Sequence, residues 1–167
     1  MKTLLEHLVM TMAVGGGATV LLDLWTIARR RAFGTPLPDY GLVGRWIAHM
    51  ADGTFRHERI ALAPAVHGER ALGWAAHYAI GIAFAAVLVA LWGFEWLERP
   101  ALVPALAVGL GSVAAPFLLM QPGMGAGIAA RKTPRPWAAR FQSVVTHGVF
   151  GLGLYFAAQA AQLFINP

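Results

Sequence analysis

Three ionisable side chains lie at similar depths inside long apolar segments of the chain. Asp23 lies six residues before a run of three arginines, and His77 and His147 each lie seven residues after an arginine. At 1.5 Å per helical residue, each would lie roughly 10 Å inside an apolar layer. An ionisable group at that depth is costly, so it predicts a functional site. One carboxylate and two imidazoles could bind a proton or an ion, or could ligate a haem or a divalent metal.

Four apolar segments would position these side chains. Each is about 20 residues long, which is the length that spans a bilayer as a helix. The predicted spans are residues 8–28, 71–93, 101–121 and 141–164. The chain is 57% hydrophobic and only 13% charged, which is typical of membrane proteins. We therefore expect an all-α fold, a polytopic four-helix membrane bundle forming a single integral-membrane domain over residues 1–167. The first segment is expected to be a retained span, since no cleavage site follows it.

The basic residues predict the orientation of the spans. The loops at residues 29–70 and 122–140 contain seven and four lysines or arginines, whereas the opposite side has only Lys2 and Arg99. Under the positive-inside rule both loops face the cytoplasm and both termini are periplasmic. This placement also accounts for the basic character of the chain, so we expect no nucleic-acid partner. The absence of cysteine excludes disulfides, thiolate metal sites and c-type haem attachment.

The first cytoplasmic loop is predicted to contain a short amphipathic helix. Its apolar residues fall on one helical face, and Asp39 is well placed to cap the start. Such a helix would lie in the membrane interface, with Arg45 and Trp46 at the level of the headgroups.

Two loop segments could contact a ligand. The basic segment from Arg56 to Arg59 could bind anionic headgroups. The segment from Gly123 to Gly127 could let the backbone approach a ligand, although it is not a phosphate-loop pattern. In addition, His67 and Glu69 lie just before the second span and could form an access route to the polar cluster.

Small residues predict which way the histidines face. Gly81 follows His77 by four residues, and Gly151 follows His147 by four. Such spacing marks the faces on which membrane helices approach closely, so both histidines are expected to face the bundle. Gln121 closes the third span and gives it a polar group as well. The small residues on these two stripes are Gly73, Gly81, Ser143 and Gly151.

The two histidines also share a local sequence pattern. In each case an arginine precedes the histidine with six residues between them, and a glycine follows it with three residues between them. One interpretation is a tandem pair of hairpins related by an axis along the membrane normal, with His77 and His147 meeting near that axis. The other is chance, because topology alone would place an arginine before each span.

Three functions remain open from the sequence. The first is binding of an ion or small ligand, extending to proton-linked transport by an oligomer, with Asp23, His77 and His147 in the site and Gln121 in support. The second is a haem- or metal-binding accessory subunit of a larger membrane complex, with Asp23, His77 and His147 as ligands. The third is a structural helper without a ligand. The expected partners are the lipid bilayer and a second copy or a larger complex. No spacing of a known catalytic group is present, which disfavours an enzyme.

Seven motifs together resemble one known family, which comprises small bacterial inner-membrane proteins catalogued as a domain of unknown function. They are Leu22-Asp23-Leu24-Trp25, Gly44-Arg45-Trp46, His67-Gly68-Glu69-Arg70, Gly73-Trp74-x-x-His77-Tyr78, Pro116-Phe117-x-x-Met120-Gln121-Pro122, Pro136-Trp137-x-x-Arg140 and Thr146-His147-x-x-Phe150-Gly151. The resemblance covers nearly the whole chain. It implies a stand-alone four-span protein of the bacterial inner membrane, and it brings no activity, substrate or cofactor.

Overall fold

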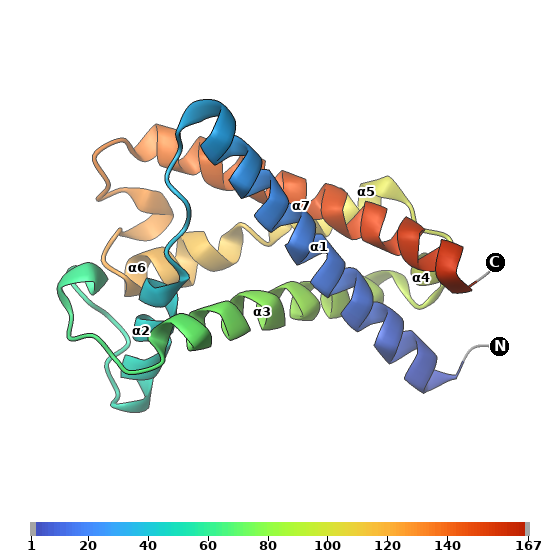
Figure 1. Cartoon of the computed structure of the whole chain (residues 1–167), viewed down its shortest axis with the longest axis horizontal. Helices are drawn as coiled ribbons and strands as arrows, with labels where there is room; N and C mark the ends of the chain where they lie inside the picture. The colour runs from blue at the N-terminus through green and yellow to red at the C-terminus, as the bar shows by residue number, and fades with distance from the viewer. Residues whose placement is uncertain (1–2, 166–167) are drawn as a thin grey trace. The chain divides into compact units, whose positions relative to one another are not determined.

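The computed structural model describes residues 3–165, which form helices joined by loops, with no β-strand among them (Figure 1). The longer helices are α1 (Leu4–Phe33), α2 (Tyr40–Ala51), α3 (Glu69–Trp92), α5 (Leu102–Gly111) and α7 (Pro136–Ile165). The shorter ones are η1 (Ile60–Leu62), α4 (Glu95–Glu98), η2 (Pro116–Met120), α6 (Gln121–Gly123) and η3 (Ile128–Ala130).

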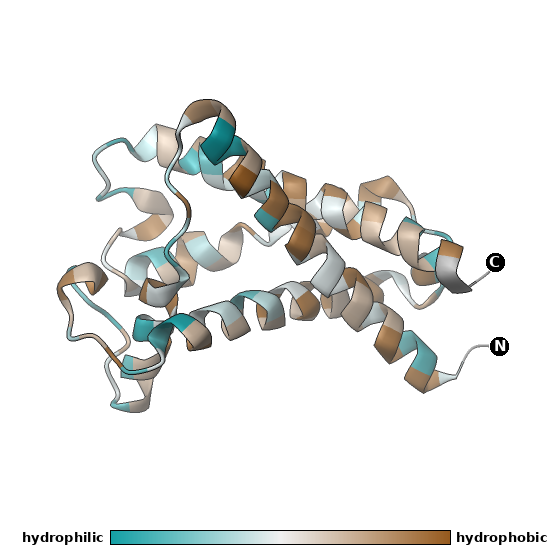
Figure 2. Cartoon of the chain, in the orientation of Figure 1, coloured by the Kyte–Doolittle hydropathy of each residue, from teal (hydrophilic) through white to brown (hydrophobic). Residues whose placement is uncertain are grey.

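Four helical stretches are long and apolar enough to cross a membrane, as the sequence predicted. They are Leu4–Phe33, Glu69–Trp92, Leu102–Gly123 and Pro136–Leu163. Figure 2 shows apolar residues along the length of each. The all-helical fold with four candidate spans is therefore confirmed. Only a helix satisfies its own backbone hydrogen bonds in lipid, which is why apolar length alone predicts these elements.

The third stretch is not a single regular helix. α5 ends at Gly111, a turn follows, and residues Pro116–Met120 form a π-helix. Pro116 has no N–H group to donate to the carbonyl of Ser112, so the α-helical ladder is interrupted there. This interruption leaves the Ser112 side chain at a helix end, where it takes part in the site described below.

The chain divides into two compact units. The first, here called the four-helix unit, combines the chain up to Leu37 with Tyr78–Ser112 and the chain from Thr146 onward. The second, here called the loop unit, comprises Pro38–His77 and Val113–Val145.

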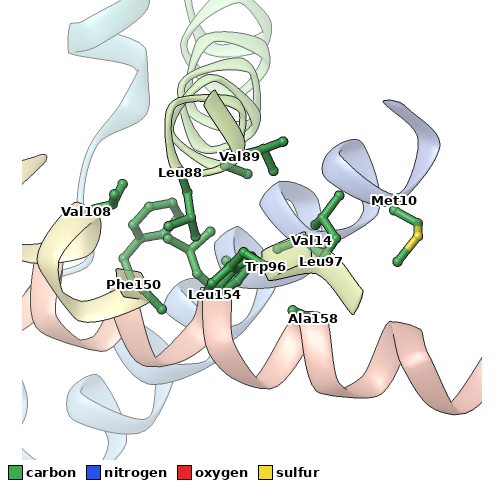
Figure 3. Close-up of a cluster of buried hydrophobic side chains, with 13 residues drawn as sticks. Met10, Val14, Leu88, Val89, Trp96, Leu97, Val108, Phe150, Leu154 and Ala158 are labelled. Carbon is green, nitrogen blue, oxygen red and sulfur yellow. The ribbon is translucent and has the colours of Figure 1, made fainter. Parts of the chain in front are cut away.

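The hydrophobic core lies in the four-helix unit and draws on α1, α3, α4, α5 and α7 (Figure 3). Its fully buried side chains include Val14, Leu88, Leu97 and Leu154. Trp96 is also buried, and its indole N–H donates to the carbonyl of Ala101, 3.0 Å away. α4 therefore folds back into the core, although it lies in the short connection between the second and third spans.

Small residues let the backbones of these helices touch. A Cβ atom added to Gly81 would lie 2.0 Å from Oγ1 of Thr19 on α1. One added to Gly109 on α5 would lie 2.3 Å from Cα of Gly151 on α7. The prediction that Gly81 and Gly151 mark helix contacts is thus confirmed. Such contacts matter in lipid because close packing, more than exclusion of water, holds membrane helices together.

Adjacent glycines on α1 give a matched test of this packing. A Cβ on Gly15 would lie 2.5 Å from Cα of Ile82, whereas nothing lies within 4 Å of one on Gly16. We expect Gly15→Ala to lower the free energy of unfolding by about 1–3 kcal/mol, since backbone must move. Gly16→Ala should leave it unchanged or raise it by up to about 1 kcal/mol. Thermal unfolding of the two variants in detergent measures the difference, and equal stabilities would contradict the close contact.

In the loop unit, α2 packs against the start of α3. The predicted helix and its cap are confirmed, since Oδ1 of Asp39 accepts from the Gly41 N–H at 2.9 Å. A Cβ on Gly44 would lie 1.8 Å from the Glu69 carbonyl, and one on Gly73 would lie 1.7 Å from the Tyr40 carbonyl. The crossing of α2 and α3 thus depends on two glycines.

Candidate functional site

Asp23 lies on α1 in the four-helix unit and is half-buried. Its Oδ2 accepts a hydrogen bond from the hydroxyl of Tyr78 on α3 at 3.0 Å. The predicted carboxylate is therefore held by a phenol group that follows His77 directly in the chain. A carboxylate has several lone pairs, so it can accept more than one hydrogen bond.

His147 lies on α7 in the same unit and contacts Ser112. Its Nδ1 is 2.7 Å from Oγ of Ser112, and that hydroxyl donates its proton to the Gly109 carbonyl at 2.6 Å. Because the carbonyl can only accept, the hydroxyl has only a lone pair to offer the ring, so Nδ1 of His147 carries a hydrogen. In the neutral ring Nε2 is then an acceptor, and no described residue hydrogen-bonds it.

His77 lies on α3 in the loop unit and has different partners. Its Nε2 is 3.1 Å from the hydroxyl of Tyr40, the first residue of α2, and the two rings stack with centroids 4.2 Å apart. The ring of Trp74 meets the histidine edge-on at 5.8 Å. His77 thus sits among aromatic rings where α2 begins.

Gln121 lies in the loop unit at the end of the π-helix. Its side-chain oxygen Oε1 is buried and has no hydrogen-bond partner among the described residues. A buried acceptor without a donor costs about 1–3 kcal/mol, so a hydrogen-bond donor at Oε1 of Gln121 would be stabilising.

The four predicted site residues are therefore divided between the two units, with Asp23 and His147 in one and His77 and Gln121 in the other. The meeting of His77 with His147, and the duplication that it implies, stay predictions. Among residues 3–165 no group of three or more His, Cys, Asp or Glu side chains is arranged to hold a metal ion. Ligation of a haem or a metal by Asp23, His77 and His147 also stays a prediction.

Glu69 forms an ion pair with Arg45. Nη2 of Arg45 lies 2.7 Å from Oε1 of Glu69, and Nε lies 2.8 Å from Oε2. The Val66 N–H also donates to Oε2 at 2.9 Å. This hydrogen bonding to Glu69 raises the pKa of Arg45 above its ordinary value, so the guanidinium stays charged. The part of Glu69 and the exposed His67 in an access route stays a prediction.

The placement of Arg45 at the level of the headgroups stays a prediction, but its side chain has partners in the loop unit that the sequence did not indicate. Its side chain is only 13% exposed, and Nη1 also donates to the carbonyl of Ala63 at 3.1 Å. Arg45 thus ties α2 to both the start of α3 and the segment that precedes it.

A pair of histidines in the loop unit was not predicted from the sequence. Nε2 of His49 is 3.1 Å from the Pro64 carbonyl, so this nitrogen donates, and Nδ1 lies 2.8 Å from Nε2 of His57. In the neutral pair His57 then donates through Nε2. Its Nδ1 is buried and has no partner in the described chain. The signal available was weak, because both histidines lie in a charge-rich loop.

Three hydroxyl partners were also missed. Ser112 is the only hydroxyl between residues 101 and 121, so it could have been chosen over Gln121 as the polar group deepest in the third span. Tyr78 stands next to His77, and Tyr40 follows the predicted cap. Each of these residues bonds one of the three predicted ionisable groups.

These residues lie within the part of the chain that a known family covers. A family model described as a protein of unknown function (DUF2938) matches residues 12–161. The chain belongs to the DUF2938 family. The resemblance found in the sequence is therefore confirmed, and the match includes Asp23, His77, Gln121 and His147. No curated protein and no solved structure matches the chain. The DUF2938 family brings no activity, so any function must be argued from the residues themselves.

Proposed function

We propose that this protein binds a small ligand or ion that offers hydrogen-bond donors, within its apolar helices. The observation that carries the proposal is the open acceptor at Nε2 of His147. The Ser112 hydroxyl accepts from Nδ1 of His147 and so fixes the hydrogen on that nitrogen. The lone pair of the neutral ring is then on Nε2, on the side of the ring away from Ser112. An imidazole with one nitrogen anchored and the other open is prepared to bind a donor or a cation.

One other group of the four-helix unit supports a donor-bearing ligand. Asp23 is a carboxylate that accepts a hydrogen bond from Tyr78. In the loop unit, Oε1 of Gln121 is by itself a buried acceptor without a partner in the described chain. The ligand class that suits such acceptors is a protonated amine, a hydroxylated compound or a hydrated cation.

The proposal extends to proton linkage. Asp23 and His147 can each take up a proton in place of a donor-bearing ligand, so the two would compete. Competition of this kind is the basis of proton-linked transport, with ionisable groups inside the spans as the coupling sites. Four spans leave little room for a translocation path, so a transporter of this size would work as an oligomer.

The test uses the full chain in lipid nanodiscs with ¹⁵N-labelled histidine. We expect the His147 resonances to report a neutral ring with hydrogen on Nδ1, and the Nε2 resonance to shift when methylammonium or sodium is added. His147→Gln should weaken binding of the responding probe at least tenfold, about 1.4 kcal/mol or more. Gln159→Leu is the control, because Gln159 is exposed on the same helix and bonds only Tyr155.

Two outcomes would contradict the proposal. A hydrogen on Nε2 would remove the open acceptor, and equal binding by wild type and His147→Gln would remove the site. Elemental analysis of the same samples tests the haem or metal alternative, since near-stoichiometric metal that is lost in His147→Gln would make Nε2 a ligand atom. If His147→Gln changes neither ligand binding nor metal content, the remaining function is that of a structural helper without a ligand.

A further inference from the structure

A pocket in the loop unit joins two loop segments, the basic segment from Arg56 to Arg59 and the glycine segment from Gly123 to Gly127. Its volume is about 320 Å³, within the range of small-molecule sites. One wall is formed by residues 56–58 and the other by residues 122–132. The lining residues are Arg56, His57, Glu58, Pro122, Gly125, Gly127, Ile128, Arg131 and Lys132.

Backbone hydrogen bonds hold the two walls together. The His57 N–H donates to the Gly123 carbonyl at 2.8 Å, and the Ile60 N–H donates to the Met124 carbonyl at 3.1 Å. Gly125 has a φ of +97°, and a Cβ there would lie 2.1 Å from the Glu58 carbonyl. The pocket is therefore a built feature of the loop unit that requires glycine in its wall.

The backbone beside the pocket is strained. Ala129 and Ala130 have φ values of 46° and 58°, a left-handed conformation that costs each roughly 1–2 kcal/mol. Nε of Arg140 donates to the Ala129 carbonyl at 2.8 Å and supports this turn. The next two residues are Arg131 and Lys132, which line the pocket. Strain that places two cations at a cavity is of the kind found at functional sites.

The charge of the pocket favours an anion. Arg56, Arg131 and Lys132 line it with a single carboxylate, Glu58, and none of these three cations forms an ion pair within residues 3–165. Arginine and lysine bind phosphate oxygens through charge-assisted hydrogen bonds, which are stronger than neutral ones.

We propose that this pocket binds a phosphate group, of the monoester class. One wall of the pocket, residues 122–132, begins at the end of the third candidate span, which ends at Gly123, and precedes the fourth, which begins at Pro136. Phosphate is found at that level of a membrane in lipid headgroups, and it also occurs on soluble compounds. The two sources share the same chemistry. The lining includes none of Asp23, Gln121 and His147, so this proposal goes beyond that function.

The experiment uses the full chain with two phosphate probes. One is ³²P-labelled inorganic phosphate in equilibrium dialysis, with phosphatidylcholine nanodiscs. The other is phosphatidic acid mixed into the nanodiscs, with retention measured by native mass spectrometry. We expect saturable binding of at least one probe, weakened about tenfold by Arg131→Gln and by Lys132→Gln. Ile128→Trp, which fills the pocket and leaves its charges intact, should weaken the same probe.

Arg135→Gln is the matched control, because Arg135 is exposed in the same segment and does not line the pocket. Binding of inorganic phosphate would assign a soluble phosphate compound, and binding of phosphatidic acid alone would assign a lipid headgroup. The proposal is overturned if neither probe binds saturably, or if Arg135→Gln weakens binding as much as Lys132→Gln. A loss confined to Arg131→Gln and Lys132→Gln, with Ile128→Trp unaffected, would also overturn it, since the charges would then act outside the cavity.

Discussion

Gly73→Ala is expected to destabilise the loop unit by several kcal/mol. The new Cβ would lie 1.7 Å from the Tyr40 carbonyl, so α2 must move away from α3. Overpacking that shifts side chains and backbone costs about 1–3 kcal/mol and occasionally more, and this contact is closer than that of Gly15, so the cost should lie at the upper end. The movement would also separate Tyr40 from His77 and Arg45 from Glu69. Thermal unfolding of the detergent-purified protein measures the loss.

Ala75→Leu is the control for Gly73→Ala, because Ala75 is exposed on the same helix and leucine is a good helix former. It should melt close to wild type. Gly44→Ala should resemble Gly73→Ala, since its Cβ would meet the Glu69 carbonyl at 1.8 Å. The double variant should be less destabilised than the sum of the two, because one separation of the helices relieves both clashes. Gly73→Ala as stable as Ala75→Leu would show that α2 and α3 are not this close.

The fold was predictable from the sequence because it follows from local features. A membrane span requires only apolar length, and α2 requires only an apolar periodicity and a cap at Asp39. The helix contacts at Gly81 and Gly151 were predictable for a related reason, since small residues at four-residue spacing mark one face. The π-helix at Pro116–Met120 was not foreseen, although Pro116 is its visible cause.

The partners of the candidate site could not be predicted, because they come from distant parts of the chain. Ser112 is 35 residues from His147, and Tyr78 is 55 residues from Asp23. The depth of a side chain follows from its position in a span, whereas its partner depends on which helix lies beside it. His77 and His147 illustrate this, since the same local sequence pattern leads to a tyrosine on α2 in one case and a serine at the end of α5 in the other.

In the loop unit, too, contacts between distant parts of the chain could not be predicted from the sequence. The basic segment at Arg56–Arg59 and the glycine segment at Gly123–Gly127 were each visible in the sequence, but nothing local indicated that they form one pocket. Their pairing depends on backbone bonds such as that from His57 to Gly123. The inward direction of Arg45 was hidden for a similar reason, since Glu69 is 24 residues away.

Arg45→Met is expected to lower the melting temperature by roughly 5–10 °C. The substitution leaves the Glu69 carboxylate without its counter-charge, although its side chain is only 20% exposed. It also removes the donor to the Ala63 carbonyl, so the segment before α3 loses its tie to α2. The melting temperature of Arg45→Lys should lie between those of wild type and Arg45→Met. An ammonium group keeps the charge but cannot make the paired hydrogen bonds of a guanidinium.

A double-mutant cycle separates the orphaned charge from lost packing. Arg45→Met combined with Glu69→Met should melt above Arg45→Met alone, because no unpaired carboxylate remains. Arg59→Met is the control, since Arg59 is exposed in the same loop and should melt close to wild type. If the melting temperature of the double variant falls by the sum of the decreases in the two single variants, Arg45 and Glu69 contribute independently. The ion pair would then not be what holds α2 to the start of α3.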